Sequence, residues 1–270
     1  MKTLISRLTR RKDLAMHATV ELADRAADVL ARIRSRAPRV HCITNSVAQA
    51  YTANMLLAAG AVPSMTLAAE EIAAFVAGAD ALLVNLGTLD GARQAAIELA
   101  LVAARDSAVP WLLDPVFVER SPARAAFARS LVGRAPAVMR LNDKEFAALA
   151  ETEAAGDAAS RFARSHGTIV ALTGAVDRVS DGAREVRIAN GDPLMGRVTA
   201  MGCAGSALVA AALAVEADAF IATVSALAVF GVAGEVAALT ARGPGSFTAT
   251  MIDALYNLER ADLRARMKVS

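Results

Sequence analysis

The chain has 270 residues, of which 55% are hydrophobic and 21% charged, and its mean hydropathy is +0.40. This composition excludes a disordered chain and predicts a large buried core. The formal net charge of +2 gives no electrostatic reason to expect a nucleic acid partner.

The N-terminal residues 1–17 show no clear periodicity, and we interpret them as an extension. Its basic residues, expected to face solvent, are Lys2, Arg7, Arg10, Arg11 and Lys12. From about residue 18 to 35, apolar residues recur at helical spacing, which predicts an amphipathic helix. We expect residues 18–270 to form a single domain.

Short apolar runs bounded by turn residues then alternate with Ala-rich stretches of a dozen or more residues. The predicted strands are RVHCIT (39–44), AVPSM (61–65), ALLVNLG (81–87), VPWLLDP (109–115), AVMRLN (137–142) and TIVALTG (168–174). Strands that alternate with helices indicate βαβ units and a mostly parallel sheet. Because such sheets are covered on both faces, we predict a three-layer α/β/α sandwich.

The last third of the chain departs from this alternation. VDRVSDGAREVRIA (176–189) has two alternating runs joined around Asp181-Gly182, which is a strong hairpin pattern. Residues 203–215, 218–240 and 247–263 are predicted to form three helices. The fold class is therefore α/β, with a small antiparallel hairpin added to the parallel sheet.

Cysteine use and apolar run lengths indicate the compartment. Cys42 and Cys203 lie far apart and form neither a disulfide framework nor a zinc pattern. The N-terminus does not resemble a signal peptide. The longest uncharged runs, 202–215 and 219–234, are shorter than the roughly 20 residues that span a bilayer. We expect a cytoplasmic protein without a membrane partner.

Polar residues gather where the predicted strands end. Ligands bind an open parallel sheet outside the carboxyl ends of its strands. Asp114 ends one strand, and Glu145 lies one turn past another. Two carboxylates near a phosphate suit Mg²⁺, which takes few protein ligands. Arg140 offers a planar fork for phosphate, and Thr173 precedes a glycine that permits close backbone approach.

The stretch TAMGCAGSA (199–207) begins an apolar helix. The free backbone N–H groups and dipole of a helix N-terminus form an anion site. Gly202 and Cys203 lie there, and a thiol at a helix N-terminus is expected to have a lowered pKa. A small buried cysteine at a tight helix–sheet contact is the alternative interpretation.

Several blocks, taken together, resemble the hydroxyethylthiazole kinase family of thiamine salvage, within the ribokinase-like superfamily. The blocks run from about Pro38 to Leu258. They are HCITNSVAQAYTANMLLAAGAVPSM, LLVNLGTL, WLLDPV, VALTGAVDRVSDG, NGDPLMGRVTAMGC, AVFGVAGEVA and GPGSF. The resemblance implies ATP- and Mg-dependent phosphorylation of the side-chain hydroxyl of 4-methyl-5-(2-hydroxyethyl)thiazole. It also implies a homotrimer with substrate sites at subunit interfaces.

The resemblance assigns residues to a substrate site by their position in these blocks. Met65 is similar to a thiazole contact, and Asn45 belongs to the same pocket. Ala200 corresponds to a substrate-contact glycine, and we also assign Gly87 to this site.

A second group is similar to the family's ATP and metal residues. Arg140 and Thr173 correspond to ATP contacts, to which we add Asn142. Asp114 and Glu145 correspond to the carboxylates on the Mg²⁺ side.

Cys203 stands where the family has its cysteine and where other ribokinase-like enzymes keep an aspartate base. Phosphoryl transfer passes through a loose transition state, so positioning outweighs base strength. We therefore expect the Gly202 and Cys203 amides to hold the transferring phosphoryl group. Cys203 is then expected to assist the hydroxyl without being indispensable.

The sequence departs from the family pattern near this chemistry. The family's Gly-Thr-Gly-Cys is Ala200-Met201-Gly202-Cys203, and Phe117 and Glu119 replace small residues. The family's Arg-Gly-Asn has Leu141 at its centre. Two alternatives therefore stay open: a kinase of another small heteroaromatic alcohol, such as a hydroxymethylpyrimidine, or a degenerate protein that binds thiazole or nucleotide without turnover.

Overall fold

A computed structural model describes the backbone of residues 2–270 and the side chains from residue 19 onward. An eight-stranded sheet has the order β2-β1-β3-β4-β5-β6-β7-β8. The parallel part contains β1 (Arg39–Ile43), β2 (Val62–Ser64), β3 (Ala81–Asn85), β4 (Trp111–Asp114), β5 (Val138–Leu141) and β6 (Ile169–Leu172). The strands β7 (Asp177–Ser180) and β8 (Glu185–Ile188) are antiparallel. The predicted mostly parallel sheet and its hairpin are confirmed.

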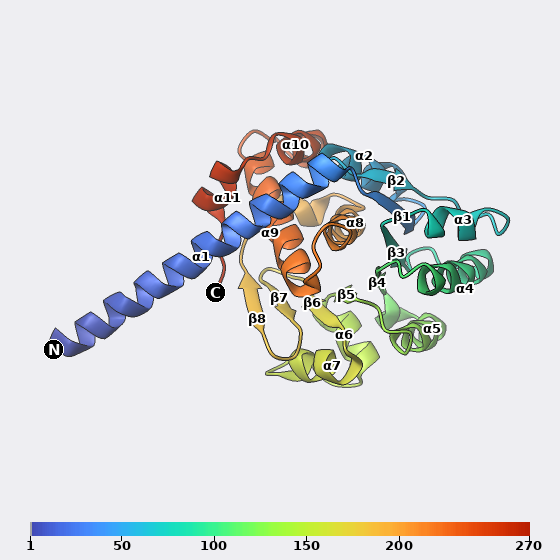
Figure 1. Cartoon of the computed structure of the whole chain (residues 1–270), viewed down its shortest axis with the longest axis horizontal. Helices are drawn as coiled ribbons and strands as arrows, with labels where there is room; N and C mark the ends of the chain where they lie inside the picture. The colour runs from blue at the N-terminus through green and yellow to red at the C-terminus, as the bar shows by residue number, and fades with distance from the viewer. Residues whose placement is uncertain (1) are drawn as a thin grey trace.

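Helices cover both faces of the sheet (Figure 1). One layer contains α1 (Lys2–Arg36), α2 (Gln49–Ala59), α8 (Met201–Leu213), α9 (Ala219–Ala238), α10 (Pro244–Asn257) and α11 (Arg260–Arg266). The other contains α3 (Ile72–Ala77), α4 (Gly91–Asp106), α5 (Pro122–Val132), α6 (Asp143–Ala150) and α7 (Ala158–His166). Short 3-10 helices, η1 (Val118–Arg120) and η2 (Pro193–Arg197), lie in connections. The predicted three-layer α/β/α architecture is therefore confirmed.

Each strand supplies side chains to both layers because successive residues of a strand point to opposite faces. In β3, Leu83 packs in the layer that contains α8 and α9, while Leu82 and Val84 pack in the layer formed by α3 to α7. All five residues of β3 are buried. This central strand therefore reads as a continuous apolar run, as expected for a parallel sheet covered twice.

Two sequence expectations about helices need comment. The helix predicted over about 18–35 is part of α1, which also runs through residues 2–17; its first half stands clear of the body (Figure 1). The predicted solvent exposure of the basic side chains in this extension lies outside the described side chains. The helix predicted over 247–263 is wrong as a single element, because the backbone is extended at Leu258 and Glu259 and separates α10 from α11.

The α9 helix is long and apolar enough to cross a membrane by length and composition. However, 83% of its most apolar window is buried inside the protein. It packs on α1, α8 and α10, and against β6, β7 and β8. Its hydrophobicity is therefore accounted for by its place in the core.

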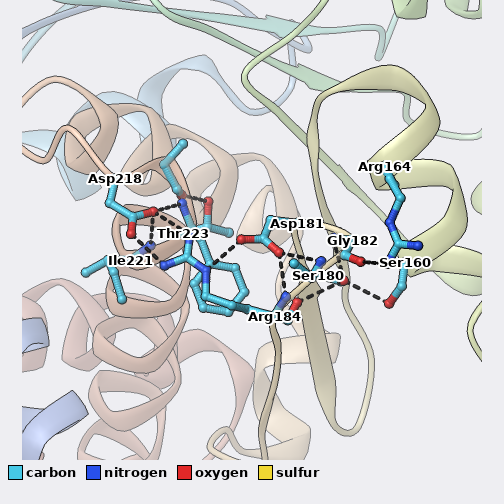
Figure 2. A network of polar contacts seen from close by, with 12 residues as sticks. Ser160, Arg164, Ser180, Asp181, Gly182, Arg184, Asp218, Ile221 and Thr223 are labelled. Carbon is cyan, nitrogen blue, oxygen red and sulfur yellow. Dashed lines mark hydrogen bonds and ion pairs between the residues drawn. The ribbon is translucent and has the colours of Figure 1, made fainter.

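The β7–β8 hairpin is fixed to the rest of the molecule at its tip (Figure 2). Gly182 has a φ of +89°, a left-handed conformation that glycine adopts freely. Arg184 pairs with Asp181 (2.6 Å) and Asp218 (2.7 Å), and its guanidinium lies 4.3 Å from the centroid of the Phe220 ring. These contacts connect the hairpin predicted from Asp181-Gly182 to the N-terminus of α9.

The C-terminal residues cover the free edge of β8. Val269 forms an antiparallel bridge with Ile188, and the backbones of Arg187 and Ser270 exchange two hydrogen bonds (2.9 and 3.0 Å). Lys268 donates its backbone N–H to the side chain of Asn190 at 2.7 Å. The chain end thereby holds the loop that follows β8.

Candidate active site

Two adjoining cavities open at the carboxyl ends of the central strands. The smaller one, about 310 Å³, is lined by Asn45, Asp114, Val116, Phe117, Arg140, Leu141, Asn142, Glu145, Thr173, Thr199, Ala200, Gly202 and Cys203. The larger one, about 590 Å³, shares Arg140, Thr173 and Gly202 with it and extends along β8 and α9. Nine of the eleven residues predicted for the site therefore line one cavity; Met65 and Gly87 do not.

Asp114 ends β4 opposite Asn85, the last residue of β3. Its Oδ2 accepts hydrogen bonds from Asn85 Nδ2 and from Ser206 Oγ, both at 2.7 Å. Burial raises the pKa of the Asp114 carboxyl, while the charge of Arg140 and these two donors act in the opposite direction. A carboxylate is thus held rigidly on the cavity wall.

Glu145 lies in the first turn of α6 and forms a capping box with Asn142. Glu145 Oε2 accepts from the N–H of Asn142 at 2.8 Å, and Oε1 accepts from the N–H of Phe117 at 2.9 Å. Asn142 Oδ1 in turn accepts from the backbone of Lys144. Burial raises the pKa of Glu145, and the neighbouring negative charge of Asp114 raises it further. The two carboxylates therefore repel each other across the cavity.

Arg140 connects the two cavities. Its guanidinium donates to the carbonyl of Gly202 at 3.0 Å and to Ser206 Oγ at 3.3 Å. Its Nε is buried without a partner among the described residues. Thr173, just past β6, also lines both cavities and donates its N–H to the carbonyl of Leu141 at 2.9 Å. Arg140 and Thr173 thus mark the junction of the two cavities.

The N-terminus of α8 lies on the cavity wall. The N–H of Ala204 reaches the carbonyl of Ala200 at 2.9 Å, and the N–H groups that precede it have no carbonyl one turn earlier in the helix. Ala200 itself has φ 70° and ψ −7°, the left-handed conformation that favours glycine. The helix N-terminus for which an anion site is predicted therefore lies on the cavity wall, with an alanine in a strained position.

The thiol pKa of Cys203 is raised, whereas the sequence predicted that it would be lowered. Burial raises the pKa of its thiol to about 12, and the charge of Asp114 adds to this effect. The expectation of a lowered pKa is wrong, because removal from water outweighs the helix N-terminus. The sulfur accepts a hydrogen bond from Asn85 Nδ2 at 3.3 Å.

Three predicted substrate residues follow the strands at the β1 side of the sheet. Asn45 follows β1, lines the smaller cavity and accepts the N–H of Val47 at 3.2 Å. A Cβ on Gly87 would lie 2.6 Å from Asn45 Nδ2, so only glycine fits against this side chain. Met65 follows β2, is half-buried and packs against the core.

Two polar residues that contact the site were assigned no role from the sequence. Asn85 is fully buried and contacts both Asp114 and Cys203. Ser206 is also fully buried and lies one helical turn after Gly202. The detectable pattern was a single hydroxyl in an otherwise apolar helix and an amide that ends an apolar strand. Among the side chains from residue 19 onward, no group of three or more His, Cys, Asp or Glu is arranged to hold a metal ion.

Comparisons with known proteins identify the family of this chain. Residues 30–261 match the family described as "Hydroxyethylthiazole kinase family". A protein of Agrobacterium fabrum named "Probable hydroxyethylthiazole kinase" is 44% identical over 242 residues, which cover 89% of this chain and 93% of that protein.

Solved structures are similar over most of their length. The hydroxyethylthiazole kinase protein of Pyrococcus horikoshii OT3 is 39% identical with a TM-score of 0.87, covering 91% of this chain and 98% of that one. A ribokinase-like superfamily protein of Enterococcus faecalis V583 has a TM-score of 0.66 at 12% identity, over 84% of this chain and 89% of that one, and so shares the fold. The chain therefore belongs to the hydroxyethylthiazole kinase family and is a phosphotransferase with a ribokinase-like fold.

Proposed function

We propose that this protein phosphorylates the side-chain hydroxyl of 4-methyl-5-(2-hydroxyethyl)thiazole with ATP as donor. The observation that carries the proposal is the junction of two cavities at the N-terminus of α8, beside Arg140. A nucleotide in the larger cavity and an alcohol in the smaller one would meet at this junction. Family membership supplies the identity of the alcohol.

ATP is proposed to lie along the larger cavity with its phosphates toward Arg140 and Thr173. The position of Arg140 on the walls of both cavities supports this placement, because a planar guanidinium suits phosphate oxygens. Asn142 contributes to the same site through its position at the N-terminus of α6, although its own Oδ1 is used to cap that helix.

Asp114 and Glu145 are proposed to hold Mg²⁺. Burial raises the pKa of both carboxyls, and the charge of Asp114 raises that of Glu145 further, so a bound cation would favour their ionised forms. Because three of their oxygens already accept hydrogen bonds from the protein, the pair suits an ion that keeps most of its waters. When bound, the ion would neutralise charge on the transferring phosphoryl group.

The amides of Gly202 and Cys203 are proposed to receive the transferring phosphoryl group at the start of α8. A thiol with a pKa of about 12 is protonated near neutral pH, so Cys203 serves as a hydrogen-bonding partner of the hydroxyl. Its part is positioning, since a loose transition state needs little proton removal before transfer. We therefore expect Cys203→Ser to retain turnover.

The thiazole is proposed to contact Asn45, Gly87, Ala200 and Met65. Met65 lies outside the cavity, which supports a site completed by a second subunit. Exposed apolar side chains occur on this side of the molecule, on α2, β2 and α3: Leu57, Val62 and Phe75. A homotrimer in the cytoplasm is the proposed state, and two buried free cysteines are consistent with a reducing compartment.

The proposal is tested by measuring ADP release from Mg-ATP with and without the thiazole, with the product mass checked. Phosphorylated thiazole is the expected product. ADP release only with a hydroxymethylpyrimidine would instead identify a different alcohol, and absence of nucleotide binding would indicate a degenerate site. Light scattering should give about three times 27.9 kDa.

A further inference from the structure

Asn85 is a fully buried polar residue whose side-chain hydrogen bonds all serve the site. It ends β3, directly opposite Asp114 in the sheet register. Its Nδ2 donates to Asp114 Oδ2 at 2.7 Å and to Cys203 Sγ at 3.3 Å. Its Oδ1 accepts the N–H of Gly87 at 2.9 Å. One amide therefore joins three parts of the proposed machinery.

The Gly87 contact fixes which way the amide of Asn85 faces. A backbone N–H can only donate, so the atom it meets must be Oδ1. The NH₂ group must then face Asp114 and Cys203, and its two hydrogens match two acceptors. The sulfur consequently receives a hydrogen from Asn85, and the thiol hydrogen must point elsewhere.

Asp114 and Cys203 depend on Asn85 to different degrees. Asp114 Oδ2 accepts a second hydrogen bond of the same length, 2.7 Å, from Ser206 Oγ. For the sulfur of Cys203, Asn85 is the one side-chain donor among the described residues. Loss of Asn85 would therefore leave the carboxylate held and the thiol free to rotate.

We propose that Asn85 is a positioning residue for phosphoryl transfer, which acts by holding the thiol of Cys203 toward the cavity. The inference rests on the proposed function. In the substrate complex, the sulfur accepts a hydrogen bond from Asn85. The S–H group of Cys203 is then oriented toward the hydroxyl of the alcohol. Asn85 itself is buried behind these groups and does not line either cavity.

The test is a double-mutant cycle on the full-length protein. Asn85→Leu keeps similar volume without hydrogen bonds, and Cys203→Ala removes the sulfur. We expect Asn85→Leu to lower kcat roughly tenfold, with KM for ATP within about twofold. In the Cys203→Ala background the same change should cost less than about twofold. A change in KM for thiazole would report the lost contact to Gly87 and should be the same in both backgrounds. Ser206→Ala, which removes the other side-chain donor to Asp114, should lower kcat by the same factor in both backgrounds.

An undiminished loss in the Cys203→Ala background would overturn the proposal, as would an unchanged kcat in Asn85→Leu. If Asn85→Leu does not fold, Asn85→Ser replaces it, because serine cannot reach both acceptors. If wild-type protein makes no phosphorylated thiazole, or Cys203→Ala is inactive, the proposal is tested instead by the crystal structure of the Asn85 variant. A displaced Cys203 rotamer supports the proposal, and an unchanged one contradicts it. A wild-type protein without product would count separately against the proposed function.

Discussion

Ala200 places a side chain where the turn into α8 needs a left-handed backbone. Its φ of 70° costs an L-residue about 1 kcal/mol or more, and glycine avoids this cost. We expect Ala200→Gly to stabilise the protein by about 0.5–1 kcal/mol after the greater flexibility of unfolded glycine is subtracted. The melting temperature should rise by roughly 1–4 °C.

The matched control is Ala207→Gly, which lies in the interior of the same helix and is fully buried. That change should destabilise the protein by about 1 kcal/mol. If both variants shifted the melting temperature downward by similar amounts, the strain at Ala200 would be refuted.

The thiol of Cys203 is expected to be unreactive toward alkylating reagents near neutral pH. Because burial and Asp114 raise its pKa to about 12, the reactive thiolate is scarce below that value. Alkylation by iodoacetamide, followed by mass spectrometry, should be negligible at about pH 7 and increase steadily toward about pH 10. A short cysteine peptide provides the control, and equal rates for peptide and protein at about pH 7 would contradict the raised pKa.

At the scale of elements, α1 is attached to α11 through a carboxylate between two arginines. Asp24 Oδ1 accepts from Arg264 Nε at 2.7 Å and from Arg260 at 3.1 Å. The hydrogen bonds from Arg264 and then Arg260 lower the pKa of Asp24 to about 2. A lowered folded-state pKa contributes stability above the ordinary value of 3.8, and this is lost as the pH falls from about 4 to about 2.

Asp24→Asn should therefore lower the urea midpoint at about pH 7, and the difference from wild type should narrow below about pH 4. Asp106→Asn serves as a control, since among the side chains described from residue 19 onward Asp106 forms an ion pair with its exposed neighbour Arg105 alone. A difference between wild type and Asp24→Asn that stays constant down to about pH 2.5 would be incompatible with this ion pair.

The secondary-structure elements and the ends of the strands were predictable because short sequence patterns, such as a turn dipeptide or a polar residue after an apolar run, specify them. Asp181-Gly182 specifies a hairpin by itself, and Asp114 and Thr173 follow apolar runs that only a covered sheet explains. The break between α10 and α11 was missed because Leu258 continues the apolar periodicity. The capping box of Glu259 and Asp262 was the available signal.

The chemistry of Cys203 and the role of Asn85 could not be predicted in the same way. A thiol pKa depends on the water and charge around the folded group, and Asp114 is 89 positions away along the chain (203 − 114). Likewise, the hydrogen bond from Asn85 to Cys203 joins residues 118 positions apart. Such contacts are set by the sheet register and by how α8 packs on it, which a local pattern does not encode.

At the scale of the whole molecule, the chain end supports the wall of the larger cavity. Asn190 lines that cavity, and its side chain is held by the backbones of Lys268 (2.7 Å) and Arg266 (2.8 Å). Deletion of residues 268–270 should therefore raise KM for ATP about threefold or more while kcat changes little, because the loop after β8 loses its anchor.

Steady-state kinetics and calorimetric titration with ADP would measure this effect. Lys268→Met is the control, since it removes the ion pair with Glu235 but keeps the backbone contacts to Asn190 and β8. A deletion variant with wild-type KM for ATP would show that the loop is ordered without the chain end.

The position of α9 in the core has a consequence for how the protein is made. The helix begins at Ala219, yet it packs on α1 from the start of the chain and on β6, β7 and β8. During translation, the part of the sheet formed by β6, β7 and β8 must stay uncovered on this face until about four-fifths of the chain has left the ribosome. Nascent chains that stop before Ala219 would expose that apolar face, and we expect them to depend on chaperones or to be degraded.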